Sequence, residues 1–143
     1  MAKLTSTSSV VINVPADKVW SALTDPKQIK EYLFGTDATS DWKEGSSITY
    51  TGEWQGKPYE DKGRIIKMVP EKLLHTTYLS SNSGKEDKPE NYANVVYKLE
   101  ERKGGTFISI SQDNIENKEQ LAHMEQNWST VLNSMKELLE KSS

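Results

Sequence analysis

The sequence contains no cysteine, which excludes a disulfide framework and any metal site built on thiolates. It also has no apolar run close to the roughly 20 residues of a membrane span. Its N-terminus shows no apolar segment typical of a signal peptide. The formal net charge of -3 offers no broad basic surface to nucleic-acid phosphates or anionic lipid. We therefore expect a cytoplasmic protein with no membrane span and no nucleic-acid partner.

The chain is long enough and aromatic enough to build a core. Its 143 residues match the commonest domain size, and we expect one domain over residues 1–143. Only 34% of the residues are apolar, but four Trp and six Tyr supply large surfaces for burial. At this length no disulfide or metal is needed to stabilise the fold.

The first part of the chain predicts one strand and two short helices. Residues 10–14 are rich in β-branched side chains and are interpreted as the end of the strand. Pro15 and Asp17 are typical of a helix start. Asp25 and Pro26 end this helix and begin a second one over about residues 27–32.

The middle of the chain predicts antiparallel strands joined by tight turns. Apolar and polar residues alternate over residues 48–54, and the next two residues fit a hairpin turn. Residues 59–69 form the returning strand, and residues 73–79 the strand after it. Residues 80–91 contain no apolar residue, so we expect a long exposed loop that either borders a binding site or is only solvated.

The last part of the chain predicts two more strands and a long helix. One strand contains alternating apolar residues at positions 95, 97 and 99, and a Gly-Gly turn leads into the other at residues 106–111. Asn117 is a candidate helix cap, with Gln120 at capping-box spacing. About 24 helical residues follow, roughly 36 Å at 1.5 Å per residue. Their apolar side chains fall in one stripe: Leu121, Met124, Trp128, Val131, Leu132, Met135, Leu138 and Leu139.

This order of elements predicts an α+β fold. Its parts are a curved antiparallel β-sheet, a long C-terminal helix around which the sheet wraps, and two short helices after the first strand. Hairpin-linked strands curl because they twist, and the apolar face of such a sheet needs a cover. The terminal helix has both the length and the apolar stripe to provide that cover.

Four segments carry a resemblance to a known family. Residues 14–26 read Val-Pro-Ala-Asp-Lys-Val-Trp-Ser-Ala-Leu-Thr-Asp-Pro. Residues 63–66 read Gly-Arg-Ile-Ile, residues 70–73 Pro-Glu-Lys-Leu, and residues 100–106 Glu-Glu-Arg-Lys-Gly-Gly-Thr. With these motifs the chain resembles the START-like SRPBCC superfamily, which shares the helix-grip fold with birch-pollen-allergen-like proteins. It is most similar to the bacterial branch related to the activator of the ninety-kilodalton heat-shock chaperone ATPase. The resemblance runs almost end to end and implies a helix-grip fold. Its caps, turns and core residues indicate no reaction.

No motif for catalysis or for metal or cofactor binding is present. The sequence lacks a His-x-x-x-His pair, a Gly-x-Ser-x-Gly elbow and a phosphate-binding glycine loop. We therefore assign no catalytic residue, no metal ligand and no cofactor. His123 lies off the apolar stripe and is interpreted as a surface residue. An inward Asp61 under aromatic side chains is a candidate general acid or base, and the simpler interpretation is a solvated carboxylate.

The strongest candidate binding site is a set of aromatic and methionine side chains that can converge between sheet and helix. Tyr and Trp combine apolar surface with a polar tip, and Met adapts to irregular shapes. Either these residues fill the core or, as the family resemblance implies, they line a cavity. His75 joins the set if its strand turns it inward, and otherwise it is an ordinary strand histidine. The candidate ligand-binding residues are Tyr50, Trp54, Tyr59, His75, Tyr97, Met124, Trp128 and Met135.

Three functions follow, in order of preference. The first is a non-enzymatic domain that holds a hydrophobic small molecule between sheet and helix. The second, implied by the resemblance, is a protein-interaction domain with a chaperone partner. Eukaryotic members carry an additional N-terminal domain, whereas this chain starts directly at its first strand. The third is an enzyme of the cyclase or hydrolase type that uses His75 or Asp61 in the same cavity.

Overall fold

A computed structural model describes residues 3–33, 35–54, 56–79 and 86–142. Within these residues the strands form one seven-stranded antiparallel sheet with the order β1-β7-β6-β5-β4-β3-β2. The strands are β1 (Leu4–Ile12), β2 (Asp37–Ser40), β3 (Ser47–Trp54), β4 (Lys57–Val69), β5 (Leu73–Tyr78), β6 (Ala93–Arg102) and β7 (Gly105–Ile115). The helical elements are α1 (Ala16–Thr24), α2 (Pro26–Tyr32), the 3₁₀ turn η1 (Pro89–Asn91) and α3 (Lys118–Ser142).

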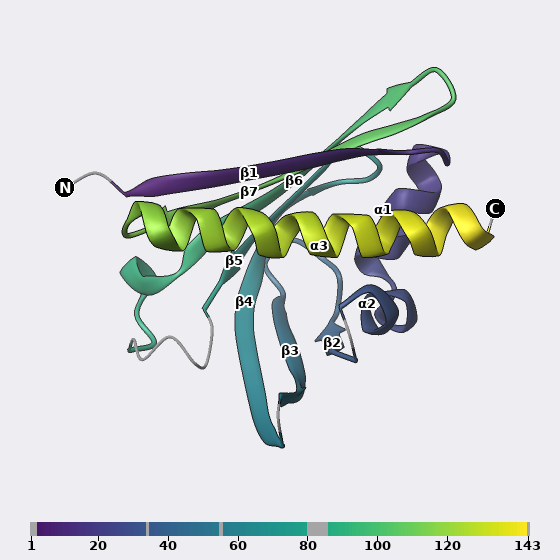
Figure 1. Cartoon of the computed structure of the whole chain (residues 1–143). Helices are drawn as coiled ribbons and strands as arrows, with labels where there is room; N and C mark the ends of the chain where they lie inside the picture. Colours follow the sequence, from purple (N-terminus) through teal and green to yellow (C-terminus); the bar gives the residue numbers. More distant parts are fainter. Residues whose placement is uncertain (1–2, 34, 55, 80–85, 143) are drawn as a thin grey trace.

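The long helix α3 lies across one face of the curved sheet (Figure 1). It runs beside β1, while α1 and α2 lie near its C-terminal end. The hairpin of β3 and β4 extends away from the helix. This arrangement confirms the predicted α+β helix-grip fold. No helix in the described ranges is both long and apolar enough to cross a membrane.

Several boundaries differ from the sequence prediction for local reasons. The first strand ends at Ile12, because Val14 N–H donates to the Ile12 carbonyl at 2.8 Å and turns the chain. The four-residue strand β2 was not predicted, since it is an edge strand that pairs only with β3. The predicted loop over residues 80–91 contains η1 at its end, and residues 80–85 lie outside the described residues.

The start of α3 follows the predicted cap. Gln120 N–H donates to Asn117 Oδ1 at 2.8 Å, which satisfies one of the first backbone donors of the helix. The Gln120 side chain accepts from Glu116 N–H at 3.4 Å rather than from the cap residue itself. The cap therefore fixes where α3 begins relative to the end of β7.

The apolar stripe of α3 is buried unevenly along its length. Leu132, Met135 and Leu139 are almost fully buried in the core with Ile12 and Ile108. By contrast, the stripe residues of the N-terminal half are only half-buried: Leu121, Met124 and Trp128. The interface between helix and sheet is thus closely packed toward the C-terminus of α3 and open toward its N-terminus.

Candidate functional site

A cavity of about 720 Å³ lies between the sheet and α3. Alternation along the strands sends every second side chain toward it, including Thr76 of β5, Val95 of β6 and Ile110 of β7. On the other side, α3 contributes residues spaced three or four apart, which share one helix face. These residues are Met124, Trp128, Val131 and Met135.

Aromatic rings form much of the cavity wall. The Tyr97 and Trp128 rings lie edge to face, with centroids 6.1 Å apart and an interplanar angle of 89°. Trp128 Nε1 donates to Gln112 Oε1 at 3.0 Å, so the helix is tied to the sheet through a polar contact as well. Tyr50 and Tyr78 form a second pair, with centroids 6.3 Å apart. Such geometries are favourable for aromatic pairs and hold the wall in place.

The hydroxyl groups of the wall tyrosines are bonded to the protein. Tyr78 Oη donates to Asp61 Oδ2 at 2.7 Å, and Tyr32 Oη donates to the Ala22 carbonyl at 2.9 Å. Tyr59 Oη lies 2.6 Å from Thr36 Oγ1. Because these hydroxyls are bonded within the protein, the three tyrosines present mainly ring surface to the cavity.

The absence of a side chain at Gly52 permits the position of the Tyr59 ring. A Cβ atom there would lie 2.4 Å from Tyr59 Oη, so any side chain would displace the phenol ring. The missing side chain at Gly52 lets the Tyr59 ring cross its partner strand in the hairpin and reach Thr36.

Burial raises the pKa of Tyr32, Tyr50 and Tyr97 above the usual value for tyrosine. The neighbouring Tyr97 raises the pKa of Tyr50 further, in part through a hydrogen bond between the two side chains. All three phenols are therefore neutral at physiological pH.

Six of the eight predicted binding residues line this cavity: Tyr50, Tyr59, Tyr97, Met124, Trp128 and Met135. The Trp54 side chain lies outside the described residues, so that prediction stays open. Leu132 and Leu139, from the same helical stripe, are buried core residues instead.

His75 lies on the opposite face of the sheet, which corrects the expectation that it lines the space under the helix. Its neighbours Leu74 and Thr76 point inward, so alternation turns His75 outward. There His75 Nε2 lies 2.9 Å from Asn94 Oδ1, and Asn94 in turn donates to Asp113 Oδ2 at 2.9 Å. His75 is thus the ordinary strand histidine of the alternative interpretation.

Several cavity residues were missed by the sequence analysis. Tyr78 shares parity with Leu74 and Thr76, so strand alternation carried a signal for it. Tyr32 and Thr36 reach the wall from α2 and the segment after it, and no periodicity indicates that position. His123, interpreted as a surface residue, is exposed but borders the cavity.

Besides the tyrosines, the titratable side chains of the described wall are Glu53, Asp61 and His123. Asp61 lines the cavity, as the enzymatic interpretation required, and it is hydrogen-bonded to Tyr78. The described lining contains neither serine nor cysteine, the commonest hydroxyl and thiol nucleophiles. No group of three or more His, Asp or Glu in the described ranges is placed to hold a metal ion. The described wall therefore combines apolar ring and methionine surface with two carboxylates and one imidazole.

Comparison with known proteins identifies the family. The model of the family "Activator of Hsp90 ATPase homolog 1-like protein" matches residues 13–140. A comparison with curated proteins finds no match. A protein from Cytophaga hutchinsonii with a known solution structure is 45% identical, with coverage of 99% of this chain and 97% of that one and a TM-score of 0.87.

Two more distant structures share the fold. The Aha1 dimer from Colwellia psychrerythraea is 21% identical over 96% of each chain, with a TM-score of 0.76. CalU16 from Micromonospora echinospora is 19% identical over 97% of this chain and 84% of that one, with a TM-score of 0.73. With the match of the family model to most of its length, this chain belongs to the Aha1-like family of START-like SRPBCC proteins.

Proposed function

We propose that this protein binds a hydrophobic small molecule in the cavity between the sheet and α3. The observation that carries the proposal is a cavity of about 720 Å³ with an aromatic and methionine wall. This volume lies within the roughly 300–1,000 Å³ of small-molecule sites. Such sites are mainly apolar, with a few polar groups that orient the ligand.

The ring and methionine surfaces of the wall favour a mainly apolar ligand, and its carboxylates Glu53 and Asp61 disfavour an anionic one. The phenols of Tyr32, Tyr50 and Tyr97 stay protonated, because desolvation within the protein raises their pKa. Apolar ligand surface that leaves water there contributes roughly 25 cal/mol per Å² to the binding free energy. The entropic cost of association is subtracted from this gain.

Trp128 provides the readout for the first experiment. Titration with a panel of medium-chain alcohols, fatty acids and phenols should shift or quench tryptophan emission, because Trp128 lines the cavity. The response should disappear in Trp128→Phe, which keeps an aromatic ring in the wall. It should persist in Trp42→Phe, whose altered side chain is half-buried but is not among the cavity-lining residues. Absence of any response from the unmodified protein would overturn the proposal.

A second candidate function is a protein interaction of the chaperone-activator type. The match to a family named for an activator of the Hsp90 ATPase favours it. The test is the ATPase rate of a bacterial ninety-kilodalton chaperone with and without this protein, together with a binding measurement between the two. A raised rate is the expected result for this function, and an unchanged rate with no binding would contradict it.

A further inference from the structure

A second hollow of about 680 Å³ adjoins the cavity at the N-terminal end of α3. We call it the amide groove. Its described lining comes from the ends of β5 and β7, the start of β6, the turn η1 and the first turns of α3. Four residues line both hollows: Tyr78, Gln112, His123 and Met124. The two hollows therefore adjoin at these four side chains.

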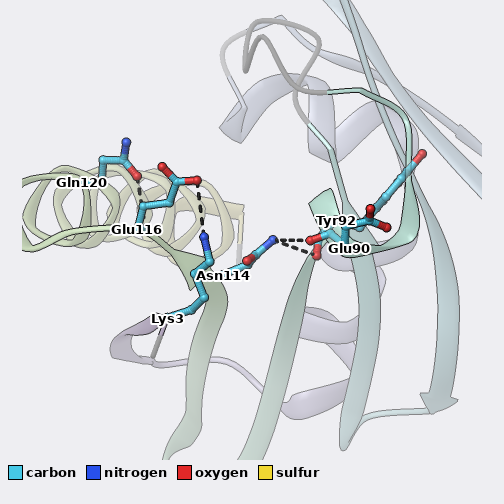
Figure 2. Close-up of polar contacts among 6 residues, drawn as sticks. All are labelled: Lys3, Glu90, Tyr92, Asn114, Glu116 and Gln120. Atoms are coloured by element: carbon cyan, nitrogen blue, oxygen red, sulfur yellow. Dashed lines mark hydrogen bonds and ion pairs between the residues drawn. The ribbon is translucent and has the colours of Figure 1, made fainter. Parts of the chain in front are cut away.

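Hydrogen bonds fix the elements around the groove (Figure 2). Asn114 Nδ2 donates to the carbonyls of Glu90 and Tyr92, at 3.2 and 3.3 Å, which ties the end of β7 to η1 and to the start of β6. The Gln120 side chain accepts from Glu116 N–H, and Lys3 pairs with the Glu116 carboxylate at 3.4 Å. The groove wall is thus built from elements that are held relative to one another.

Amide side chains distinguish the groove from the cavity. Its described lining includes six of them: Asn91, Gln112, Asn114, Asn117, Gln120 and Gln126. An amide has both a donor end and an acceptor end. Five of these six use one end in a bond within the protein: the NH₂ of Asn91 and Asn114, and the oxygen of Gln112, Asn117 and Gln120.

The remaining ends form a mixed set. Within the described residues, the oxygens of Asn91 and Asn114 remain as acceptors, and the NH₂ groups of Gln112, Asn117 and Gln120 remain as donors. Hydroxyl groups match such a set, because each hydroxyl both donates and accepts. A carboxylate or phosphate only accepts and would leave the acceptor oxygens without partners.

The charged side chains of the amide groove also favour an uncharged group over an anionic one. Among the described lining residues there is no Lys or Arg, and Glu119 contributes a carboxylate. An anionic group would meet this negative charge with the exposed His123 as its sole basic neighbour in the described lining, which makes its desolvation costly.

We propose that the amide groove holds the uncharged, hydroxyl-rich headgroup of an amphipathic ligand whose apolar part lies in the cavity. This inference rests on the proposed function, and it adds the class of ligand: an alkyl or aryl chain attached to a polyol or sugar. The stretch of α3 from Glu119 to Met135 borders the two hollows and spans roughly 24 Å at 1.5 Å per residue, which suits an elongated molecule.

The test compares probes with one chain length and different heads. Octyl glucoside, octanoate, octyl phosphate and 1-octanol are titrated by calorimetry at pH 7, below their micelle-forming concentrations. Octyl glucoside should bind at least tenfold more tightly than octanoate and octyl phosphate. In NMR spectra its headgroup should shift the side-chain NH₂ signals of Gln112, Asn117 and Gln120.

Two isosteric variants test the groove itself. Asn117→Asp keeps the oxygen that caps α3, and Gln120→Glu keeps the acceptor for Glu116 N–H, so both are expected to fold. Each removes one donor and adds a negative charge at a helix N-terminus, where it is tolerated. Each should weaken octyl glucoside binding roughly threefold to tenfold and leave 1-octanol binding unchanged. The control, Asn133→Asp, makes the same change at an exposed position of α3 that borders neither hollow.

The outcomes separate the two proposals. If 1-octanol binds but octyl glucoside binds no better than octanoate, the headgroup assignment is wrong and the hydrophobic-cavity proposal stands. If both donor-deleting variants bind octyl glucoside as tightly as the control, the amide groove does not hold the headgroup. If no probe binds, the proposed function fails together with this inference.

Discussion

At the scale of single residues, the tyrosines of the cavity wall combine two properties. Their rings provide apolar surface and their hydroxyls are satisfied by neighbours such as Asp61, Thr36 and the Ala22 carbonyl. A buried phenol with a hydrogen-bond partner is stable while it is neutral, but its ionised form is strongly disfavoured. The contribution of these tyrosines to the stability of the fold therefore depends on pH in the alkaline range.

The first prediction concerns this alkaline range. In the unfolded chain a tyrosine ionises near pH 10, whereas Tyr50 and Tyr97 in the folded protein have raised pKa values. Above pH 10 the unfolded state loses protons that the folded state keeps. The stabilising contribution of these two tyrosines is thus complete below about pH 10. As the pH rises further, the free energy of unfolding falls by up to about 1.4 kcal/mol per pH unit for each tyrosine.

Urea unfolding between pH 9 and 11 measures this slope. Tyr97→Phe removes one of the titrating groups and should give a shallower loss of unfolding free energy than the unmodified protein. A parallel titration by tyrosinate absorbance should show the folded-state ionisations above pH 10. Equal slopes for the two proteins would show that Tyr97 ionises with its ordinary pKa.

At the scale of elements, the cavity depends on close pairing between β4 and β5. Gly63 sits where β4 passes β5, and a Cβ there would lie 1.7 Å from the Thr77 carbonyl oxygen. Since the obstacle is backbone, it cannot rotate away as a side chain can. The register also shifts between Ile65 and Lys67, which turns β4 locally.

The second prediction is that Gly63→Ala destabilises the fold by about 3 kcal/mol, because the strands must separate to admit the methyl group. Gly104→Ala is the matched control: its Cβ has open space, and its φ of +84° alone costs about 1 kcal/mol. Urea unfolding of both variants measures the difference. Equal destabilisation would mean that β4 relaxes around the methyl group.

At the scale of the whole molecule, the space between the sheet and α3 is only partly filled by core side chains, and the rest is a cavity. Core residues such as Ile12, Val19 and Ile108 lie at 0% exposure near the C-terminal half of α3. The cavity borders this core at Met135 and Leu23. Side chains that line an empty cavity lack the packing contacts that a filled core would give them. A larger cavity therefore favours ligand binding but lowers the stability of the empty protein.

The third prediction is that filling the cavity with a larger side chain stabilises the protein and weakens ligand binding. Val131→Phe adds volume to a half-buried cavity residue of α3 and should raise the free energy of unfolding by about 0.5–2 kcal/mol. It should also weaken 1-octanol binding by at least about tenfold, as ligand and side chain compete for the same space. Thr130→Phe, at the exposed neighbouring position, should change neither. Thermal unfolding and calorimetry measure both effects, and undiminished binding to Val131→Phe would place the ligand elsewhere.

Much of the fold was predictable because its signals are local. The α3 stripe, the Asn117 cap and the alternation in β3 each follow from residues close together in sequence. The strand β2 was missed because Asp37–Ser40 has no apolar alternation, and pairing with β3 alone makes it a strand. Tyr32 and Thr36 were missed as wall residues because their positions depend on how α2 packs.

The sequence by itself determined the helix-grip fold, the order of the elements other than β2 and η1, and six of the side chains that line the space under α3. Only the tertiary structure decided that Tyr50, Tyr97 and Trp128 surround a cavity instead of filling it, and that His75 faces away from it. The physical reason is that periodicity assigns a side chain to a face, whereas the distance between two faces depends on sheet curvature and helix position. Those are set jointly by contacts between residues far apart in the chain.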